Sequence, residues 1–201
     1  MLSVFSNGRR RLMAAAVSLA FAAALAGCGE KQAEFLGSDI SGTHLGKDMA
    51  LQDTDGKPHT LSDYKGKVVV VFFGYTQCPD VCPTSMATLG EAMEQLGDDA
   101  GKVQVLMISV DPERDTPEIL KAYVSAFNPD FVGLRGTPDE LSATAKSFKA
   151  YYAKVAGTAP GQYAMDHAAS FYLFDKDGEV RALINSNAPA ADIVHDIRQL
   201  L

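Results

Sequence analysis

The sequence predicts an α/β fold in which helices cover a central mixed sheet. Residues 68–73 form a continuous apolar run of β-branched and aromatic side chains, which is typical of a strand buried on both faces. Residues 84–96 then carry apolar side chains at helical spacing, so a helix follows that strand directly. Two turns that end in glycine, 53–56 and 175–178, each lie between two short strand-like segments. A strand–helix unit between two hairpins predicts a mixed sheet covered by helices.

The first element that we expect is an N-terminal β-hairpin. Strands over 49–52 and 57–61 flank its turn, in which Gly56 supplies the positive φ. The central strand and its helix come next, and a second buried strand follows at 103–110.

Helix start signals organise the next part of the chain. Thr116 and Pro117 supply an N-cap and a first-turn proline for a helix that ends near residue 127. A short strand is expected at 131–134. The segment Thr137-Pro138-Asp139-Glu140 is a capping box that opens another helix.

A second hairpin and a last helix complete the pattern. Strands over 170–174 and 180–184 flank the second turn, and residues 188–201 form an amphipathic helix. A β-hairpin, a βαβ unit with an extra helix, another hairpin and a final helix together predict a thioredoxin-like fold.

The N-terminus has the pattern of an export signal. Three arginines, Arg9 to Arg11, precede an uncharged apolar stretch, 12–26, that is too short to span a bilayer comfortably. The stretch ends in Leu-Ala-Gly-Cys28, which resembles a bacterial lipobox, where the signal is cut before a cysteine that then takes a lipid. We therefore expect a lipoprotein signal peptide over 1–27, a flexible tether over 28–44 and one domain over 45–201.

The charge of the chain argues against nucleic acid as a partner. The whole chain carries a net charge of −7, and the part from Cys28 onward carries −10, because the only charged residues before it are the three arginines. A polyanion is not expected to bind nucleic acid through its net field.

Two of the three cysteines are left for chemistry once Cys28 is assigned to a lipid. Cys78 and Cys82 lie just past the carboxyl end of the central strand and at the start of a helix, where ligand sites of α/β sheets collect. A helix N-terminus lowers thiol pKa values, and the three-residue spacing lets both sulfurs share one helical face. A disulfide between such near neighbours would stabilise the fold little, so the pair indicates redox or metal chemistry.

Three separated motifs resemble the signatures of the Sco/SenC family. They are Cys78-Pro79-Asp80-Val81-Cys82-Pro83, Ser109-Val110-Asp111-Pro112-Glu113-Arg114-Asp115-Thr116-Pro117 and Asp166-His167. The resemblance covers the chain from about Ser38 to its end. It implies that Cys78, Cys82 and His167 bind one copper ion, and that the protein supports assembly of the dinuclear CuA site of cytochrome c oxidase subunit II. With the lipobox, it implies a lipid anchor in the inner membrane, a domain that faces the periplasm, and a thiol reductase as a second partner.

The ligand types agree with copper. Two thiolates suit Cu(I), and an added imidazole makes Cu(II) tolerable, so a Cys2His set can hold both oxidation states. Zinc also accepts this set with one open position, so the preference for copper comes mainly from the resemblance.

Other polar or soft side chains are assigned weaker roles. Asp166 could orient His167, although adjacent residues near a strand point apart. The segment 111–115 lies at the same sheet edge. Its Asp115 and Arg114 could dock a partner or pair with each other, or the segment could only be a capped loop that enters the next helix. Met86 and Met93 have the helical spacing of core residues. The remaining histidines, His44, His59 and His195, are expected in solvent.

Two other functions stay open at this stage. A thiol-disulfide oxidoreductase or peroxidase is disfavoured, because the cysteine spacing is not C-x-x-C and Tyr75 and Val71 stand where a peroxiredoxin has threonine and proline. A copper or redox sensor would use the same three ligands, and ligand identity does not separate it from a carrier.

Overall fold

The computed structural model describes residues 33–157 and 162–201. Glu34–Leu201 form one compact unit. The signal peptide expected over 1–27 and the lipidation site expected at Cys28 lie outside the described residues. Within the described ranges, no helix is long and apolar enough to cross a membrane.

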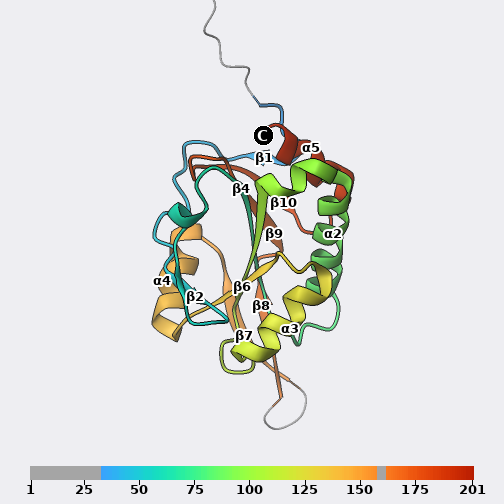
Figure 1. Ribbon diagram of the computed structural model, residues 1–201. Coiled ribbons are helices and arrows are strands. Elements are labelled where there is room, and N and C mark those ends of the chain that lie inside the picture. Colours follow the sequence, from blue (N-terminus) through green and yellow to red (C-terminus); the bar gives the residue numbers. More distant parts are fainter. Residues whose placement is uncertain (1–32, 158–161) are drawn as a thin grey trace, which may run out of the picture. The chain divides into compact units, whose positions relative to one another are not determined.

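An eight-stranded mixed sheet forms the centre of the domain (Figure 1). Its middle is parallel and consists of β4 (Val68–Gly74), β5 (Val103–Ser109) and β6 (Val132–Arg135). Antiparallel strands extend the sheet beyond β4 through β9 (Ser170–Phe174), β10 (Val180–Asn185) and β1 (Ser38–Asp39). Beyond β6 the sheet continues through β2 (Leu51–Asp53) and β3 (Pro58–His59). The predicted mixed sheet and its N-terminal hairpin are therefore confirmed.

Helices cover both faces of this sheet. The helices are α2 (Val81–Leu96), α3 (Pro117–Phe127), α4 (Pro138–Phe148) and α5 (Ala190–Arg198), and two short 3-10 helices are η1 (Leu61–Tyr64) and η2 (Gly97–Lys102). Helix α2 packs against both α3 and α5, and α4 lies on the opposite side of the sheet (Figure 1). Thr116 and the box of Thr137 and Glu140 cap α3 and α4 as predicted.

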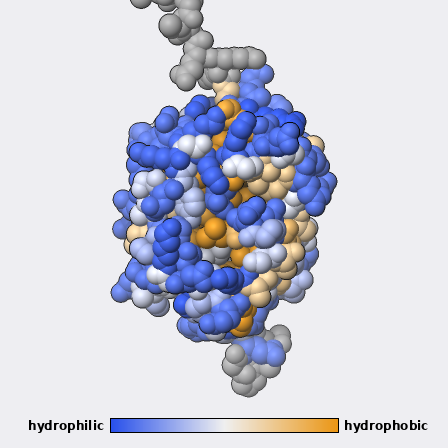
Figure 2. All heavy atoms as spheres, viewed as in Figure 1, coloured by the Kyte–Doolittle hydropathy of each residue, from blue (hydrophilic) through white to orange (hydrophobic). Residues whose placement is uncertain are grey.

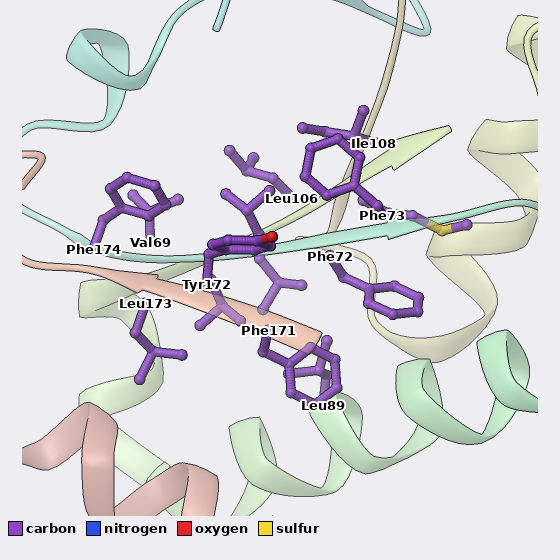
Figure 3. Close-up of a cluster of buried hydrophobic side chains, with 14 of the residues drawn as sticks. Val69, Phe72, Phe73, Leu89, Leu106, Ile108, Phe171, Tyr172, Leu173 and Phe174 are labelled. Carbon is purple, nitrogen blue, oxygen red and sulfur yellow. The ribbon is translucent and has the colours of Figure 1, made fainter. Parts of the chain in front are cut away.

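The central strand β4 is buried on both faces, as its continuous apolar run predicts. Phe72 packs against Phe171 on one face, with ring centroids 5.5 Å apart, and in Figure 3 both lie on the side of Leu89 in α2. Phe73 points to the other face and packs against Phe148 of α4, at 5.2 Å. Because successive side chains of a strand alternate, an apolar residue at every position serves two separate cores.

The N-terminal segment joins the domain earlier than the sequence predicts. The backbone N–H groups of Leu36 and Gly37 donate to the buried carboxylate of Asp196 in α5, at 2.7 and 2.9 Å. Strand β1 then pairs with β10. Part of the segment expected as tether, 28–44, therefore belongs to the domain, which begins before residue 45.

A separate two-stranded sheet is the main element that the sequence reading lacks. It consists of β7 (Tyr152–Ala156) and β8 (Tyr163–His167), which pair antiparallel and project beyond the end of the main sheet (Figure 1). His167 is the last residue of β8 and not, as expected, part of a loop. The hairpin escaped prediction because its residues are mostly half-buried or exposed and lack a clean apolar alternation.

The surface in the view of Figure 1 is mainly hydrophilic. The most apolar side chains show in a band down the middle of this face, and mildly apolar ones lie along its right edge (Figure 2). The large apolar side chains that are exposed in the described part of the chain are Leu36, Val81, Ile119, Tyr151 and Val155.

Candidate metal centre

Cys78 and Cys82 lie at the junction of the central strand and its helix. The chain leaves β4 at Gly74, and Cys78 lies in the turn that precedes α2, whereas Cys82 lies in the first turn of that helix. The two cysteines therefore do not share one helical face. They approach each other because the turn folds back, so that the backbone N–H of Cys82 donates to the Cys78 sulfur at 3.5 Å.

Glycine at position 74 leaves room for the inner sulfur. A Cβ at Gly74 would lie 2.8 Å from the Phe72 ring, 3.2 Å from the Cys82 Sγ and 3.2 Å from the end of Met107. Any larger residue would therefore push against the sulfur. Cys82 is fully buried and Cys78 is half-buried, so the pair has an inner and an outer member.

His167 brings the third candidate ligand from the far end of the sequence. Its Nε2 lies 3.3 Å from the Cys82 Sγ, and its Nδ1 lies 3.1 Å from the carbonyl oxygen of Ala168. A carbonyl can only accept, so Nδ1 carries the proton and the lone pair of Nε2 faces the sulfur. The rings of Phe72 and Tyr75 stand edge-on to the imidazole, at 6.0 and 5.9 Å, and fix its plane.

The local electrostatics give the three groups different protonation preferences. Partial burial pushes the pKa of the Cys78 thiol upward, but backbone N–H groups of Asp80, Cys82 and Val81 point at its sulfur and hold the pKa below its ordinary value. Burial raises the pKa of the Cys82 thiol well above its ordinary value. Burial lowers the pKa of His167, which favours the neutral imidazole that metals bind.

The donor atoms of these three side chains lie close enough to hold one ion. One ligand atom from each of Cys78, Cys82 and His167 lies within 4.8 Å of the other two. Two sulfurs and a neutral imidazole nitrogen form a soft donor set, which suits copper or zinc. All three residues named from the sequence are therefore brought together.

A buried carboxylate supports the turn that carries Cys78. Asp115 is fully buried and accepts hydrogen bonds from the hydroxyls of Thr76 and Ser109, each at 2.6 Å, and from the backbone N–H of Thr76. Burial raises the pKa of Asp115 above its ordinary value. Because Thr76 precedes Cys78 by two residues, this network ties the turn after β4 to the end of β5.

The rest of the segment 111–115 faces the hairpin that carries His167. Asp111 is buried and pairs with Arg114, and the hydroxyl of Tyr163 donates to Asp111 at 2.9 Å. Arg114 therefore pairs with Asp111 and not with Asp115, the partner considered from the sequence, because Asp115 accepts from Thr76 and Ser109 instead. The contribution of Tyr163 could not be foreseen, because nothing in its local sequence marks it.

The remaining residues singled out in the sequence lie away from the sulfurs or pack in the core. Met86 and Met93 are buried in α2, as predicted. Asp166 is exposed, and its neighbour His167 is held by a carbonyl instead.

The histidines outside the site only partly follow the expectation. His44 and His195 keep exposed side chains. For His59 the expectation of a solvated side chain is wrong: it is 8% exposed and lies between the Asp53 carboxylate, at 2.9 Å, and the Tyr64 hydroxyl, at 2.8 Å. Each ring nitrogen thus has a partner, one from β2 and one from η1, and the Tyr64 ring of η1 also stacks on the imidazole.

Comparison with known proteins decides the family. The family model SCO1/SenC matches residues 38–201, which is most of the chain and all of the site. The chain belongs to the SCO1/SenC family. The mitochondrial protein SCO2 of Saccharomyces cerevisiae is 38% identical over 157 residues, which are 77% of this chain and 52% of that protein. The chain thus spans about half the length of this curated SCO1/SenC relative.

Solved Sco structures share the fold. ScoI of Bradyrhizobium japonicum, solved with copper bound, is 40% identical, with a TM-score of 0.70 over 82% of this chain and 99% of that one. BsSco, described as a member of the Sco family of cytochrome c oxidase assembly proteins that has a disulfide switch, is 28% identical. Its TM-score is 0.64 over 83% of this chain and 98% of that one. These similarities confirm the thioredoxin-like fold expected for a Sco protein.

Proposed function

We propose that this protein is a copper carrier that binds one copper ion through Cys78, Cys82 and His167 and supports assembly of the CuA site of cytochrome c oxidase. The observation that carries the proposal is the convergence of two sulfurs and a neutral imidazole nitrogen within 4.8 Å. The copper-bound Bradyrhizobium relative supports copper rather than zinc, and the description of BsSco supports a role in cytochrome c oxidase assembly. Subunit II as the recipient follows from the resemblance to the family.

The arrangement of the ligands suits a carrier. The Cys82 sulfur is enclosed and fixed by its helix, whereas Cys78 is half-buried and lies on a turn at the surface. A recipient thiol can therefore reach the metal from the side of Cys78 while Cys82 and His167 still hold it. Both thiols are free in the structure. Metal binding requires both as thiolates, so a disulfide between them would prevent it.

Copper titrations of matched variants test the ligand set. His167→Ala leaves both thiolates, so Cu(I) affinity should change little, because two sulfurs suffice for that ion. Cu(II) affinity should fall by at least about 10–100-fold, the loss typical even for an outer-shell partner. His44→Ala, at an exposed histidine, is the control. Unchanged Cu(II) affinity in His167→Ala would remove His167 from the site.

The role in oxidase assembly has its own test. A strain depleted of the protein should lose the copper of oxidase subunit II, and the wild-type chain should restore it whereas the Cys78→Ser and Cys82→Ser variants should not. Full restoration by both cysteine variants would refute the carrier role.

A dithiol function at the same cysteines is the second candidate, and the described disulfide switch of BsSco favours it. Oxidation of Cys78 and Cys82 to a disulfide releases two electrons and two protons to an oxidant and removes both thiolates. A thiol reductase must then return those electrons before copper can bind. Equal copper uptake by the oxidised and the reduced protein would contradict this coupling.

We also propose that Cys28 carries a lipid that anchors the domain in the inner membrane, facing the periplasm. The lipobox pattern supports this proposal. Cys28→Ser should leave the protein unprocessed or free of the membrane fraction, with labelled lipid precursor incorporated only by the wild type. A wild-type mature N-terminus elsewhere, without acyl chains, would disprove the anchor.

A further inference from the structure

A cluster of three side chains ties the β7–β8 hairpin to the loop that follows β5. We call Asp111, Arg114 and Tyr163 the Arg114 clamp. The Nε of Arg114 donates to the Asp111 carboxylate, and its Nη1 donates to the backbone carbonyl of Tyr163 at 3.0 Å. The guanidinium carbon lies 3.7 Å from the centre of the Tyr163 ring, whose hydroxyl donates to Asp111 at 2.9 Å. Each member of the clamp thus contacts both others.

The hairpin depends on such side-chain contacts for its position. Strands β7 and β8 hydrogen-bond to each other and form a sheet separate from the eight-stranded one. An isolated two-stranded hairpin is marginally stable in water. Tyr151 and Val155, on the β7 side, are 60% and 48% exposed, so apolar packing on the core comes from the partly buried Tyr152 and Met165. The clamp is charge-assisted and has a buried member in Asp111, which makes it a strong fixed point for the hairpin.

Two routes connect the clamp to the candidate ligand His167. Along β8, Tyr163 and His167 are four residues apart, so their side chains lie on the same face of the strand. Through space, Arg114 also lies 5.6 Å from the ring of Tyr75, which stands edge-on to the His167 ring at 5.9 Å. A change in the hairpin position would therefore move His167 relative to the Cys82 sulfur, which belongs to α2.

We propose that Arg114, held by Asp111 and Tyr163, is a positioning residue that keeps His167 within bonding distance of a metal on Cys82. The inference rests on the proposed function, in that it takes His167 as a copper ligand. Its consequence is selective, because Cu(II) needs the imidazole whereas two thiolates can hold Cu(I). The clamp should therefore control the affinity for Cu(II) and leave that for Cu(I) nearly unchanged.

Two variants and one control test the clamp. Arg114→Gln removes the positive charge and the guanidinium that donates to both Asp111 and Tyr163. Tyr163→Phe removes only the hydroxyl and keeps the ring. Arg181→Gln is the matched control, because Arg181 also pairs with a carboxylate, that of Asp175 at 3.1 Å, but lies on β10. Amide hydrogen exchange in the metal-free, reduced protein reports the hairpin directly, and paired Cu(I) and Cu(II) titrations report the site.

Arg114→Gln should speed amide hydrogen exchange in β7 and β8. It should lower Cu(II) affinity by about 10–100-fold, as removal of other groups that orient a ligand does, and leave Cu(I) affinity within about threefold of wild type. Tyr163→Phe should change both quantities in the same direction by less, and Arg181→Gln should change neither. Unchanged hairpin exchange in both clamp variants would overturn the proposal, and so would equal losses of Cu(I) and Cu(II) affinity, which indicate general destabilisation. Failure of the proposed function would appear elsewhere, as unchanged Cu(II) affinity in His167→Ala.

Discussion

Replacement of Asp115 tests how the turn that carries Cys78 is supported. Asp115→Ala removes the acceptor of three donors, namely the hydroxyl and backbone N–H of Thr76 and the hydroxyl of Ser109. A hydrogen bond to a charged group contributes about 1.5–3 kcal/mol. The two hydroxyls can rotate toward other acceptors, and burial of the carboxylate is itself unfavourable, so the free energy of unfolding should fall by about 3 kcal/mol.

Asp115→Asn is the matched comparison. It keeps the shape and one carbonyl oxygen, and its amide can donate to the Ser109 hydroxyl, so the expected loss is about 1 kcal/mol or less. For a domain of this size about 1 kcal/mol corresponds to about 2–4 °C in Tm, so the alanine variant should melt about 6–12 °C below wild type. Thermal denaturation of the reduced, metal-free proteins, followed by circular dichroism, measures both. Equal Tm values for the two variants would refute this account of the turn.

The pH dependence of the stability difference between wild type and Asp115→Asn gives an independent check. Burial raises the pKa of Asp115 above 3.8, so the folded state keeps this proton to higher pH than the unfolded state does. The contribution of the carboxyl to stability is then largest at a pH below 3.8 and is lost as pH rises through the folded pKa. Asparagine does not titrate, so the stability of wild type relative to Asp115→Asn should decrease over that rise. An increase would show that burial does not dominate.

Three further outcomes follow from the site. Gly74→Ala should cost about 1–3 kcal/mol in the free energy of unfolding, measured by urea denaturation, because its Cβ would crowd the Phe72 ring and the Cys82 sulfur. Iodoacetamide near neutral pH should alkylate Cys78 before Cys82, because Cys78 is more exposed and has the lower thiol pKa; equal rates in peptide mass spectra would contradict this order. Burial lowers the pKa of His167 below 6.5. The metal-free protein should therefore lose stability as pH falls from 6.5 through the lower pKa of the folded state. His167→Gln should lose less stability than wild type over the same range, and identical pH profiles would refute the shift.

The sequence alone determined the elements whose pattern is local. The apolar run of β4 and the capping residues of α3 and α4 depend on neighbours a few residues away, and each predicted the element observed. The three motifs also placed Cys78, Cys82 and His167 in one candidate site, because their order and spacing resemble one family. These features could be predicted because the physical cause lies within a short stretch of chain.

Only the tertiary structure decided how the candidate ligands are held. His167 lies on β8, which pairs with β7 in a sheet of its own among the described residues, and its position depends on Arg114, which is 49 residues from its partner Tyr163. Asp115 accepts a hydrogen bond from Thr76, 39 residues before it, and Asp196 accepts one from the backbone of Leu36, 160 residues before it. Periodicity and capping signals carry no information about such contacts, because they form only when packing of the sheet and helices brings distant segments together.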